Sequence, residues 1–158
     1  ESGVWLDVPF VHQERNGCGA ASVSMLMRYW ARHSGTALPD DADPGKIQRA
    51  LYDQKAGGIY ASELHTYLAK HGFRTFAFQG DWSDLKQHLS RGRPLIVALG
   101  PAGNKQPLHY VLVTGLDWQR DLVLVNDPAD RKLRKMKRSN FERQWHATES
   151  WALLAVPK

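Results

Sequence analysis

The sequence predicts an α+β fold, in which helices from the N-terminal half pack on a mainly antiparallel sheet built from the C-terminal half. Two observations lead to this class. Helical periodicity dominates the first half, and the second half holds several short, nearly continuous apolar runs rich in β-branched residues. A chain of 158 residues is long enough to bury a substantial core. We therefore expect one domain spanning residues 1–158.

Four segments of the first half have the spacing and punctuation of helices. They cover residues 18–33, 46–54, 62–72 and 82–92. The first two are separated by residues 34–45, which have the composition of a loop. Gly35 and Gly72 follow the last periodic residues of the first and third helices, and Ser62 is a suitable N-cap for the third. These signals predict where the helices begin and end.

The second half is dominated by segments with the composition of strands. They cover residues 74–78, 94–99, 109–116, 122–127, 132–138 and 151–157. The segment 132–138, KLRKMKR, alternates basic and other residues and reads as an edge strand. Ser139 and Glu142 then form a capping-box pattern, which predicts a short helix through Trp145. These runs are the expected source of the sheet.

Composition restricts the class of protein further. One cysteine excludes an internal disulfide framework and a zinc site with four cysteine ligands, and no apolar run approaches the length of a membrane-spanning helix. The formal net charge of +5 owes much to residues 131–138, where six of eight positions are basic. The chain begins at Glu1 rather than Met, so we expect that an upstream segment has been removed or left out.

The single cysteine, Cys18, stands between Gly17 and Gly19 at the start of the first predicted helix. A lone cysteine is most often a small buried hydrophobe. At a helix N-terminus, however, the sulfur faces unpaired backbone N–H groups and the positive end of the macrodipole, both of which favour thiolate over thiol. The two glycines lack side chains, so we expect a substrate backbone to approach the sulfur closely. Cys18 is therefore a candidate nucleophile.

Among seven histidines, His109 is the candidate for a proton-managing partner of that thiol. His109 is the first residue of an apolar predicted strand. A polar ring in that place, at the rim of a sheet, indicates that it faces a functional site. If residues 109–116 and 122–127 form a hairpin, paired residue numbers should sum to about 236 to 238. Either even sum places Asp127 on the same face as His109, within reach of a hydrogen bond. Taken alone, Asp127 also reads as part of a strand-ending turn.

Gln13, five residues before Cys18, is the candidate oxyanion donor. An amide in that loop could donate to the negative oxygen that forms when a thiolate attacks a carbonyl, together with the Cys18 backbone N–H. An isolated glutamine here would otherwise be read as a solvated polar side chain. The order Gln, Cys, His, Asp is a stronger signal than any one of the four residues.

The stretches LDVPFVHQERNGCGAASVSMLMRYW, LHYVLVTGLD and VLVNDPA resemble the papain-like cysteine peptidases of the bacteriocin-processing, or double-glycine leader peptidase, family. The resemblance covers nearly the whole chain and implies a papain-like fold. It also implies that Cys18 is the nucleophile, His109 the general acid/base, Asp127 the residue that orients the imidazole, and Gln13 the oxyanion donor. Two departures are Ala20, where many members have proline, and a Gln13-to-Cys18 spacing one residue shorter than in papain.

The resemblance also implies a reaction and a substrate class. Thiolate attack would give a thioester that water hydrolyses, with a peptide or protein as substrate and without a metal or other cofactor. Members attached to export transporters cut after paired small residues such as Gly-Gly. This sequence has no Walker P-loop and no transporter segment, which favours a stand-alone peptidase domain. The association of such domains with export favours an extracytoplasmic location, periplasmic or at the cell envelope, over a cytoplasmic one.

Two other classes of function stay open on the sequence alone. One is a catalytically silent module that binds a peptide or a polyanion, and the other is a transglutaminase-like or amidase acyl transferase. An anionic partner could bind the basic strand through six residues: Arg131, Lys132, Arg134, Lys135, Lys137 and Arg138. No row of aromatic residues accompanies these charges, so nucleic acid is not indicated.

Overall fold

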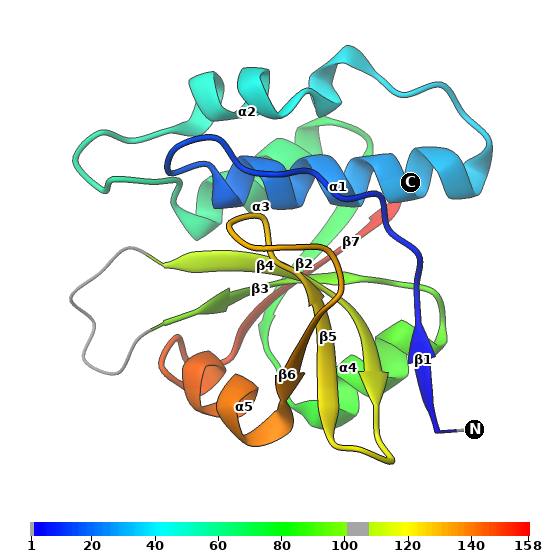
Figure 1. Ribbon diagram of the computed structural model, residues 1–158. Helices are drawn as coiled ribbons and strands as arrows, with labels where there is room; N and C mark the ends of the chain where they lie inside the picture. The colour runs from blue at the N-terminus through cyan, green and yellow to red at the C-terminus, as the bar shows by residue number, and fades with distance from the viewer. Residues whose placement is uncertain (1, 101–107) are drawn as a thin grey trace.

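The structure, a computed structural model, describes residues 2–100 and 108–158 (Figure 1). Its helices are α1 (Cys18–Ser34), η1 (Asp40–Ala42, a 3-10 helix), α2 (Pro44–Leu51), α3 (Ala61–Lys70), α4 (Trp82–Ser90) and α5 (Arg138–His146). Its strands are β1 (Gly3–Trp5), β2 (Phe73–Gln79), β3 (Leu95–Leu99), β4 (His109–Asp117), β5 (Leu122–Asn126), β6 (Arg134–Lys137) and β7 (Trp151–Pro157). Strand β1 and helix η1 were not expected from the sequence.

The strands form one sheet in the order β2-β7-β3-β4-β5-β6, and every pair is antiparallel. Strand β4 has three neighbours, because β3 pairs with its first half and β1 with its second. The β3 pairing ends at Leu99↔His109, and the β1 pairing runs from Gly3↔Asp117 to Trp5↔Gly115. His109 is therefore the first residue of a central strand, at one end of the sheet.

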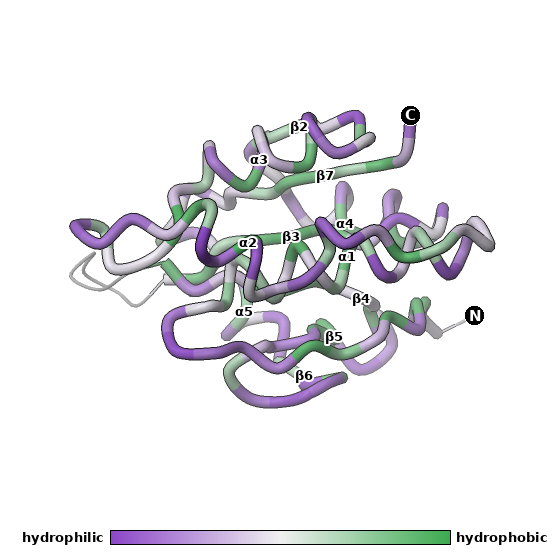
Figure 2. Tube along the Cα trace, turned by 90° about the horizontal axis from the view of Figure 1, so that it is seen from above, coloured by the Kyte–Doolittle hydropathy of each residue, from purple (hydrophilic) through white to green (hydrophobic). Residues whose placement is uncertain are grey.

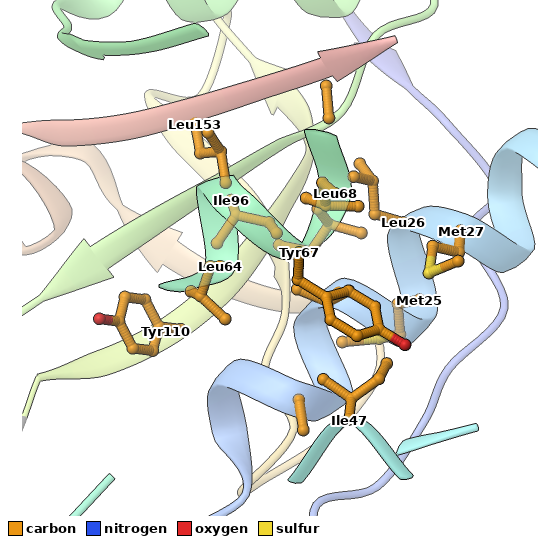
Figure 3. Packing of buried hydrophobic residues seen from close by; sticks show 14 of the residues in the cluster. Met25, Leu26, Met27, Ile47, Leu64, Tyr67, Leu68, Ile96, Tyr110 and Leu153 are labelled. Carbon is orange, nitrogen blue, oxygen red and sulfur yellow. The ribbon is translucent and has the colours of Figure 1, made fainter. Parts of the chain in front are cut away.

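Helices α1, α2 and α3 cover one face of the sheet, as predicted for the N-terminal helices (Figure 1). Figure 3 shows the contact between the layers, to which α1 contributes Met25, Leu26 and Met27. The other labelled residues there are Ile47 from α2, Leu64, Tyr67 and Leu68 from α3, and Ile96, Tyr110 and Leu153 from the sheet. Full burial of a large apolar side chain contributes roughly 1.5–3 kcal/mol, so this layer fixes α1 against β4.

Helices α4 and α5 cover the opposite face. The sequence predicted that all the early helices share one face, and for α4 this prediction is wrong. A second apolar cluster lies there, with Leu85 and Leu89 from α4 and Phe141 and Trp145 from α5. Seen from above, β3 and β7 are coloured as hydrophobic along much of their length (Figure 2). All five residues of β3 are buried, which explains its continuous apolar run.

Two of the predicted helix ends are present and one predicted helix start is wrong. Gly35 closes α1 in the left-handed conformation at φ 68°, and Gly72 follows α3 at φ 92°. Ser62 is not the N-cap of α3, because the helix already begins at Ala61. Tyr60 occupies the cap position and its side chain makes no capping hydrogen bond.

The capping box predicted at Ser139 and Glu142 is also wrong. Helix α5 begins one residue earlier, at Arg138, so Ser139 lies inside the first turn. In a capping box the Glu142 carboxylate would accept the backbone N–H of the N-cap residue. It accepts a hydrogen bond from the Arg138 side chain instead, from Nε at 3.0 Å. A capping box does occur on α4, where the Asp81 and Asp84 side chains each accept the other residue's backbone N–H.

Candidate active site

Cys18 is the first residue of α1, as predicted, and it is a free, half-buried cysteine. Its sulfur accepts a hydrogen bond from the Tyr110 backbone N–H at 3.4 Å and lies 3.9 Å from the Leu108 carbonyl oxygen. The N-cap residue, Gly17, provides no side-chain cap, so the first N–H groups of the helix have no competing side-chain acceptor there. Both the helix start and the Tyr110 N–H favour negative charge on the sulfur.

The two glycines beside Cys18 have a different role from the one expected. A Cβ atom at Gly19 would lie 3.3 Å from both the Leu64 and Tyr110 side chains, and one at Gly17 would lie 3.0 Å from the Glu14 carbonyl oxygen. Both glycines are buried. Their missing side chains therefore allow α1 and its lead-in to pack closely, and the prediction that they open the sulfur to a substrate is wrong.

His109 and Asp127 meet at the ends of β4 and β5. His109 Nε2 lies 2.7 Å from Asp127 Oδ1, so the predicted hydrogen bond is present. The histidine side chain is 33% exposed, whereas the aspartate side chain is only 2% exposed and lies behind the ring. The Cys18 side chain also interacts with the imidazole. The imidazole thus stands between a thiol and a buried carboxylate.

These contacts set the charge of the pair. Burial lowers the pKa of His109, but hydrogen bonds with Asp127 and Cys18, and their negative charges, outweigh it and raise this pKa from 6.5 to about 9. Burial raises the pKa of Asp127, but the hydrogen bond and charge of His109, with further bonds from Ala129 and Arg134, hold that pKa below its usual range. At neutral pH the site therefore holds an imidazolium and a carboxylate.

A β-bulge in β4 brings Asp127 onto the same face as His109. Near the hairpin turn the paired residue numbers sum to 239, as in Gly115↔Leu124, and beyond the bulge they sum to 238, as in Val113↔Val125. The predicted even sum is therefore wrong near the turn and correct beside the site. If the odd sum continued, Asp127 would stand opposite residue 112 and point to the other face of the sheet. The extra residue, Thr114, restores the alignment.

Gln13, Cys18 and His109 line one cleft of about 400 Å³. Gln13 is tied to the loop after β5, because its backbone N–H donates to the Pro128 carbonyl oxygen at 3.0 Å. The Gln13 Oε1 atom is buried and makes no hydrogen bond within the described residues. The Gln13 side chain thus lines the same cleft as the thiol.

The segment between α2 and α3, to which no role was assigned from the sequence, forms another wall of the cleft. This wall comprises residues 56–61. Asp53 shapes it, because its Oδ1 accepts the backbone N–H groups of Lys55 and Ala56, and its backbone pairs with Gly58. Tyr60 is 52% exposed at the rim. The tripeptide AGG, residues 56–58, is the feature of the sequence that could have indicated the part of this wall without large side chains.

Most of the basic strand is neutralised within the protein. Four of its six basic residues bond to acidic side chains: Arg131 to Asp130, Lys132 to Asp7, Arg134 to Asp127, and Arg138 to Glu142. Lys135 and Lys137 project from β6 as exposed side chains, and β6 is an edge strand as predicted. The anionic partner suggested by the sequence therefore has no support in the structure.

Residues 2–100 and 108–158 contain no group of three or more His, Cys, Asp or Glu side chains that could hold a metal ion. Over the same ranges, none of the helices combines the length and the apolar composition that a bilayer crossing requires.

Several solved structures are similar to this fold. The peptidase domain of Streptococcus ComA, a bifunctional ABC transporter, has 22% sequence identity and a TM-score of 0.73 over 96% of this chain and 100% of that one. A C39-like peptidase from Bacillus anthracis has 18% identity and a TM-score of 0.76, covering 100% and 99% of the two chains. A double glycine motif protease from an AMS/PCAT transporter, solved with its leader peptide, has 19% identity and a TM-score of 0.72, covering 98% and 95%.

At these identities the similarity establishes a papain-like C39 fold, in agreement with the predicted α+β class. Comparison with curated proteins gives no match. The family model of the Peptidase_C39 like family matches residues 5–153, which run from the last residue of β1 into the first part of β7 and include every residue of the cleft. The chain belongs to the Peptidase_C39 like family.

Proposed function

We propose that this protein is a cysteine peptidase that hydrolyses peptide bonds through a thioester intermediate. The observation that carries the proposal is the alignment of Cys18, His109 and Asp127: the imidazole hydrogen-bonds Asp127, interacts with Cys18, and lines one cleft with it. In this proposal Cys18 is the nucleophile and His109 the general acid/base. Asp127 orients the imidazole, and Gln13 donates to the oxyanion. Membership of a peptidase family supports the same assignment.

The proposed reaction has two stages. The Cys18 thiolate adds to the peptide carbonyl, and the resulting oxyanion is held by the Gln13 amide and the Cys18 backbone N–H. The C–N bond then breaks as the His109 imidazolium gives its proton to the leaving amine, which leaves a thioester. Neutral His109 next removes a proton from water, whose oxygen attacks the thioester. Breaking the C–S bond releases the acid and restores the thiolate and imidazolium.

The raised pKa of His109 suits the first stage. A pKa of about 9 keeps the imidazolium charged at neutral pH, so a proton is available for the leaving amine. As pH rises through this value the acid is lost, and we expect the rate of hydrolysis to fall on the alkaline side. The buried Asp127 carboxylate maintains the charge and the orientation of the ring.

We further propose that the scissile bond follows paired small residues such as Gly-Gly. In the cleft wall, Ala56, Gly57 and Gly58 present main chain rather than large side chains, and Ile59 and Tyr60 continue the wall. An extended peptide with small residues would lie close to such a wall. One of the similar structures is named as a double glycine motif protease bound to a leader peptide, which supports this choice.

Incubation with synthetic peptides, followed by mass spectrometry, tests the proposal. We expect a peptide with Gly-Gly to be cut after the second glycine, and a matched peptide with Val-Val at those positions to remain intact. The variants Cys18→Ser and His109→Ala should lose cleavage. The variant His146→Ala should retain it, because that exposed histidine lies at the end of α5 outside the cleft.

Three results would contradict parts of the proposal. Binding of peptides without any cleavage, unchanged in Cys18→Ser, would indicate a silent binding module. Transfer of the acyl group to an added amine, with little free acid formed, would indicate an acyl transferase. Cleavage of both peptides at equal rates would retain the peptidase and reject the preference for small residues.

A further inference from the structure

We propose that Arg134 is a positioning residue for this reaction, because its guanidinium holds the Asp127 carboxylate in the plane and charge state that His109 requires. The inference rests on the proposed peptidase function. The sequence placed Arg134 in a basic strand facing solvent or an anionic partner. The structure instead directs its Nη1 atom to Asp127 Oδ2 at a distance of 2.7 Å.

The two oxygens of Asp127 are divided between different partners. Oδ1 accepts from His109 Nε2 at 2.7 Å and from the Ala129 backbone N–H at 3.0 Å, whereas Oδ2 accepts from Arg134. A carboxylate bonded at both oxygens cannot rotate without losing a bond. Since the side chain is only 2% exposed, water cannot readily replace a lost partner. Without Arg134, the buried Oδ2 would keep its charge but lose the one side-chain donor that it has among the described residues.

The register of the sheet brings the three side chains together. Paired residues of neighbouring strands point to the same face, and Val125 pairs with both Val113 on β4 and Arg134 on β6. His109 shares the face of Val113, and Asp127 shares the face of Val125, because each is an even number of residues away. His109, Asp127 and Arg134 therefore form a charged row across three strands, at the end of an otherwise apolar face.

The loop between β5 and β6 fixes Arg134 in place. Its ends are joined by a hydrogen bond from the Asp127 backbone N–H to the Arg131 carbonyl oxygen at 3.0 Å. The Leu133 backbone N–H donates to the buried Asn126 side chain at 3.1 Å. Arg134 Nε also lies 3.7 Å from Asp130 Oδ2. In Figure 1 this connection extends from the sheet toward α1, in agreement with the backbone bond between Gln13 and the residue after Asp127.

Arg134 has no direct route to the substrate in this structure. Neither Arg134 nor Asp127 lines the cleft, whereas His109 does. Any effect of Arg134 on the reaction must therefore pass through Asp127 and the imidazole. This order of contacts distinguishes a positioning role from the anion-binding surface suggested by the sequence, in which Arg134 and its neighbour Lys135 would contribute alike.

The charges around Asp127 predict how Arg134 affects the pH dependence of the cleavage rate. The charged groups facing Asp127 are His109 from β4 and Arg134 from β6, with Asp130 beyond Arg134; Cys18 faces His109 from α1. Burial alone would raise the pKa of Asp127, and Arg134 is one of the groups that lower it. Removing Arg134 should let Asp127 take up a proton at higher pH. A protonated Asp127 has no negative charge to stabilise the His109 imidazolium. The fall of the cleavage rate on the acid side of its pH profile should therefore begin at higher pH.

The test compares kcat, KM and pH profiles of peptide cleavage in three variants. We expect Arg134→Met to lower kcat by about 10- to 100-fold, the range known for outer-shell partners of metal-bound histidines, with little change in KM. Its acid limb should move to higher pH. Arg134→Lys keeps the charge and should recover part of the loss. Lys135→Met, on the same strand but exposed, should match the wild type.

A second measurement separates positioning from a structural role. In the Asp127→Asn background the side chain has a single oxygen to accept from His109 and from Arg134. The link from Arg134 through the carboxylate to His109 is therefore already broken. Arg134→Met should then cause no further loss of kcat. An equal loss in both backgrounds would overturn the proposal, as would an unchanged profile in Arg134→Met. If that variant fails to fold, Arg134→Lys carries the comparison, and a rate and profile equal to those of Lys135→Met would overturn the proposal.

Failure of the proposed function gives a different result. If the wild type cuts no peptide, the peptidase assignment fails, and the positioning role fails with it. If the wild type cuts a peptide and Arg134→Met cuts it equally well at every pH, only the inference about Arg134 fails. The two failures are therefore distinguished by the wild-type measurement alone.

Discussion

At the scale of single residues, the chemistry depends on which atom of the Cys18–His109 pair carries a proton. Asp127 and the sulfur both favour the protonated imidazole, and together they outweigh the effect of burial on the pKa of His109. The backbone N–H of Tyr110 and the start of α1 favour charge on the sulfur. In the proposed peptidase, the combination of these contacts would place an acid, His109, beside the nucleophile, Cys18.

Gln13 provides a test at this scale. If its amide stabilises the oxyanion, Gln13→Ala should lower kcat for a Gly-Gly peptide by about 10²- to 10³-fold. The rate at which iodoacetamide alkylates Cys18 should not change, because no oxyanion forms in that reaction. Glu14→Ala, an exposed neighbour, is the matched control and should affect neither rate. A normal kcat in Gln13→Ala, or an equal fall in alkylation, would refute this role.

Three of the four candidate residues have a local signal in the sequence, whereas Gln13 is a candidate only through its place in the order Gln, Cys, His, Asp. Cys18 begins a helix, His109 begins an apolar strand, and Asp127 follows a strand that pairs with it. Arg134 has no such signal. Its charge resembles that of its neighbours, and only the fold of the loop between β5 and β6 selects Asp127 as its partner.

At the scale of elements, alternation along strands identifies most of the sheet, but it cannot locate the bulge. The run VLVTGL is apolar or β-branched throughout, so nothing in it marks Thr114 as the extra residue. Strand β1 was also missed, because three residues are too few to show a period. The wrong helix starts at Ser62 and Ser139 have a similar cause: a good capping residue does not form a cap when the helix begins before it.

The pairing of β1 with β4 beside the bulge makes a prediction about stability. A Cβ atom added at Gly115 would lie 2.5 Å from the Val4 carbonyl oxygen and 3.0 Å from Leu124 Cδ1. Gly115→Ala should therefore push β1 from β4 and lower the free energy of unfolding in urea by about 1–3 kcal/mol. Gly58→Ala meets no atom within 4 Å and should change it by less than about 0.5 kcal/mol. Equal losses in both variants would contradict this account of β1.

At the scale of the whole molecule, the candidate site lies where two layers meet. Cys18 belongs to the helical layer, and His109 and Asp127 belong to the sheet. The α+β class and the order of the elements could be read from periodicity, because burial imposes it on each element. The wall at residues 56–61 could not, since it is formed by backbone whose place depends on how the layers pack.

The most direct test of the account is the pH dependence of Cys18 alkylation by iodoacetamide in the native protein and in His109→Ala. We predict rapid alkylation of the wild type well below pH 8, because the imidazolium stabilises the thiolate. In His109→Ala the rate should rise only as an ordinary cysteine ionises, near about pH 8.5. A thiol that is inert at neutral pH, or one that reacts identically in both proteins, would contradict the ion pair on which the proposed peptidase depends.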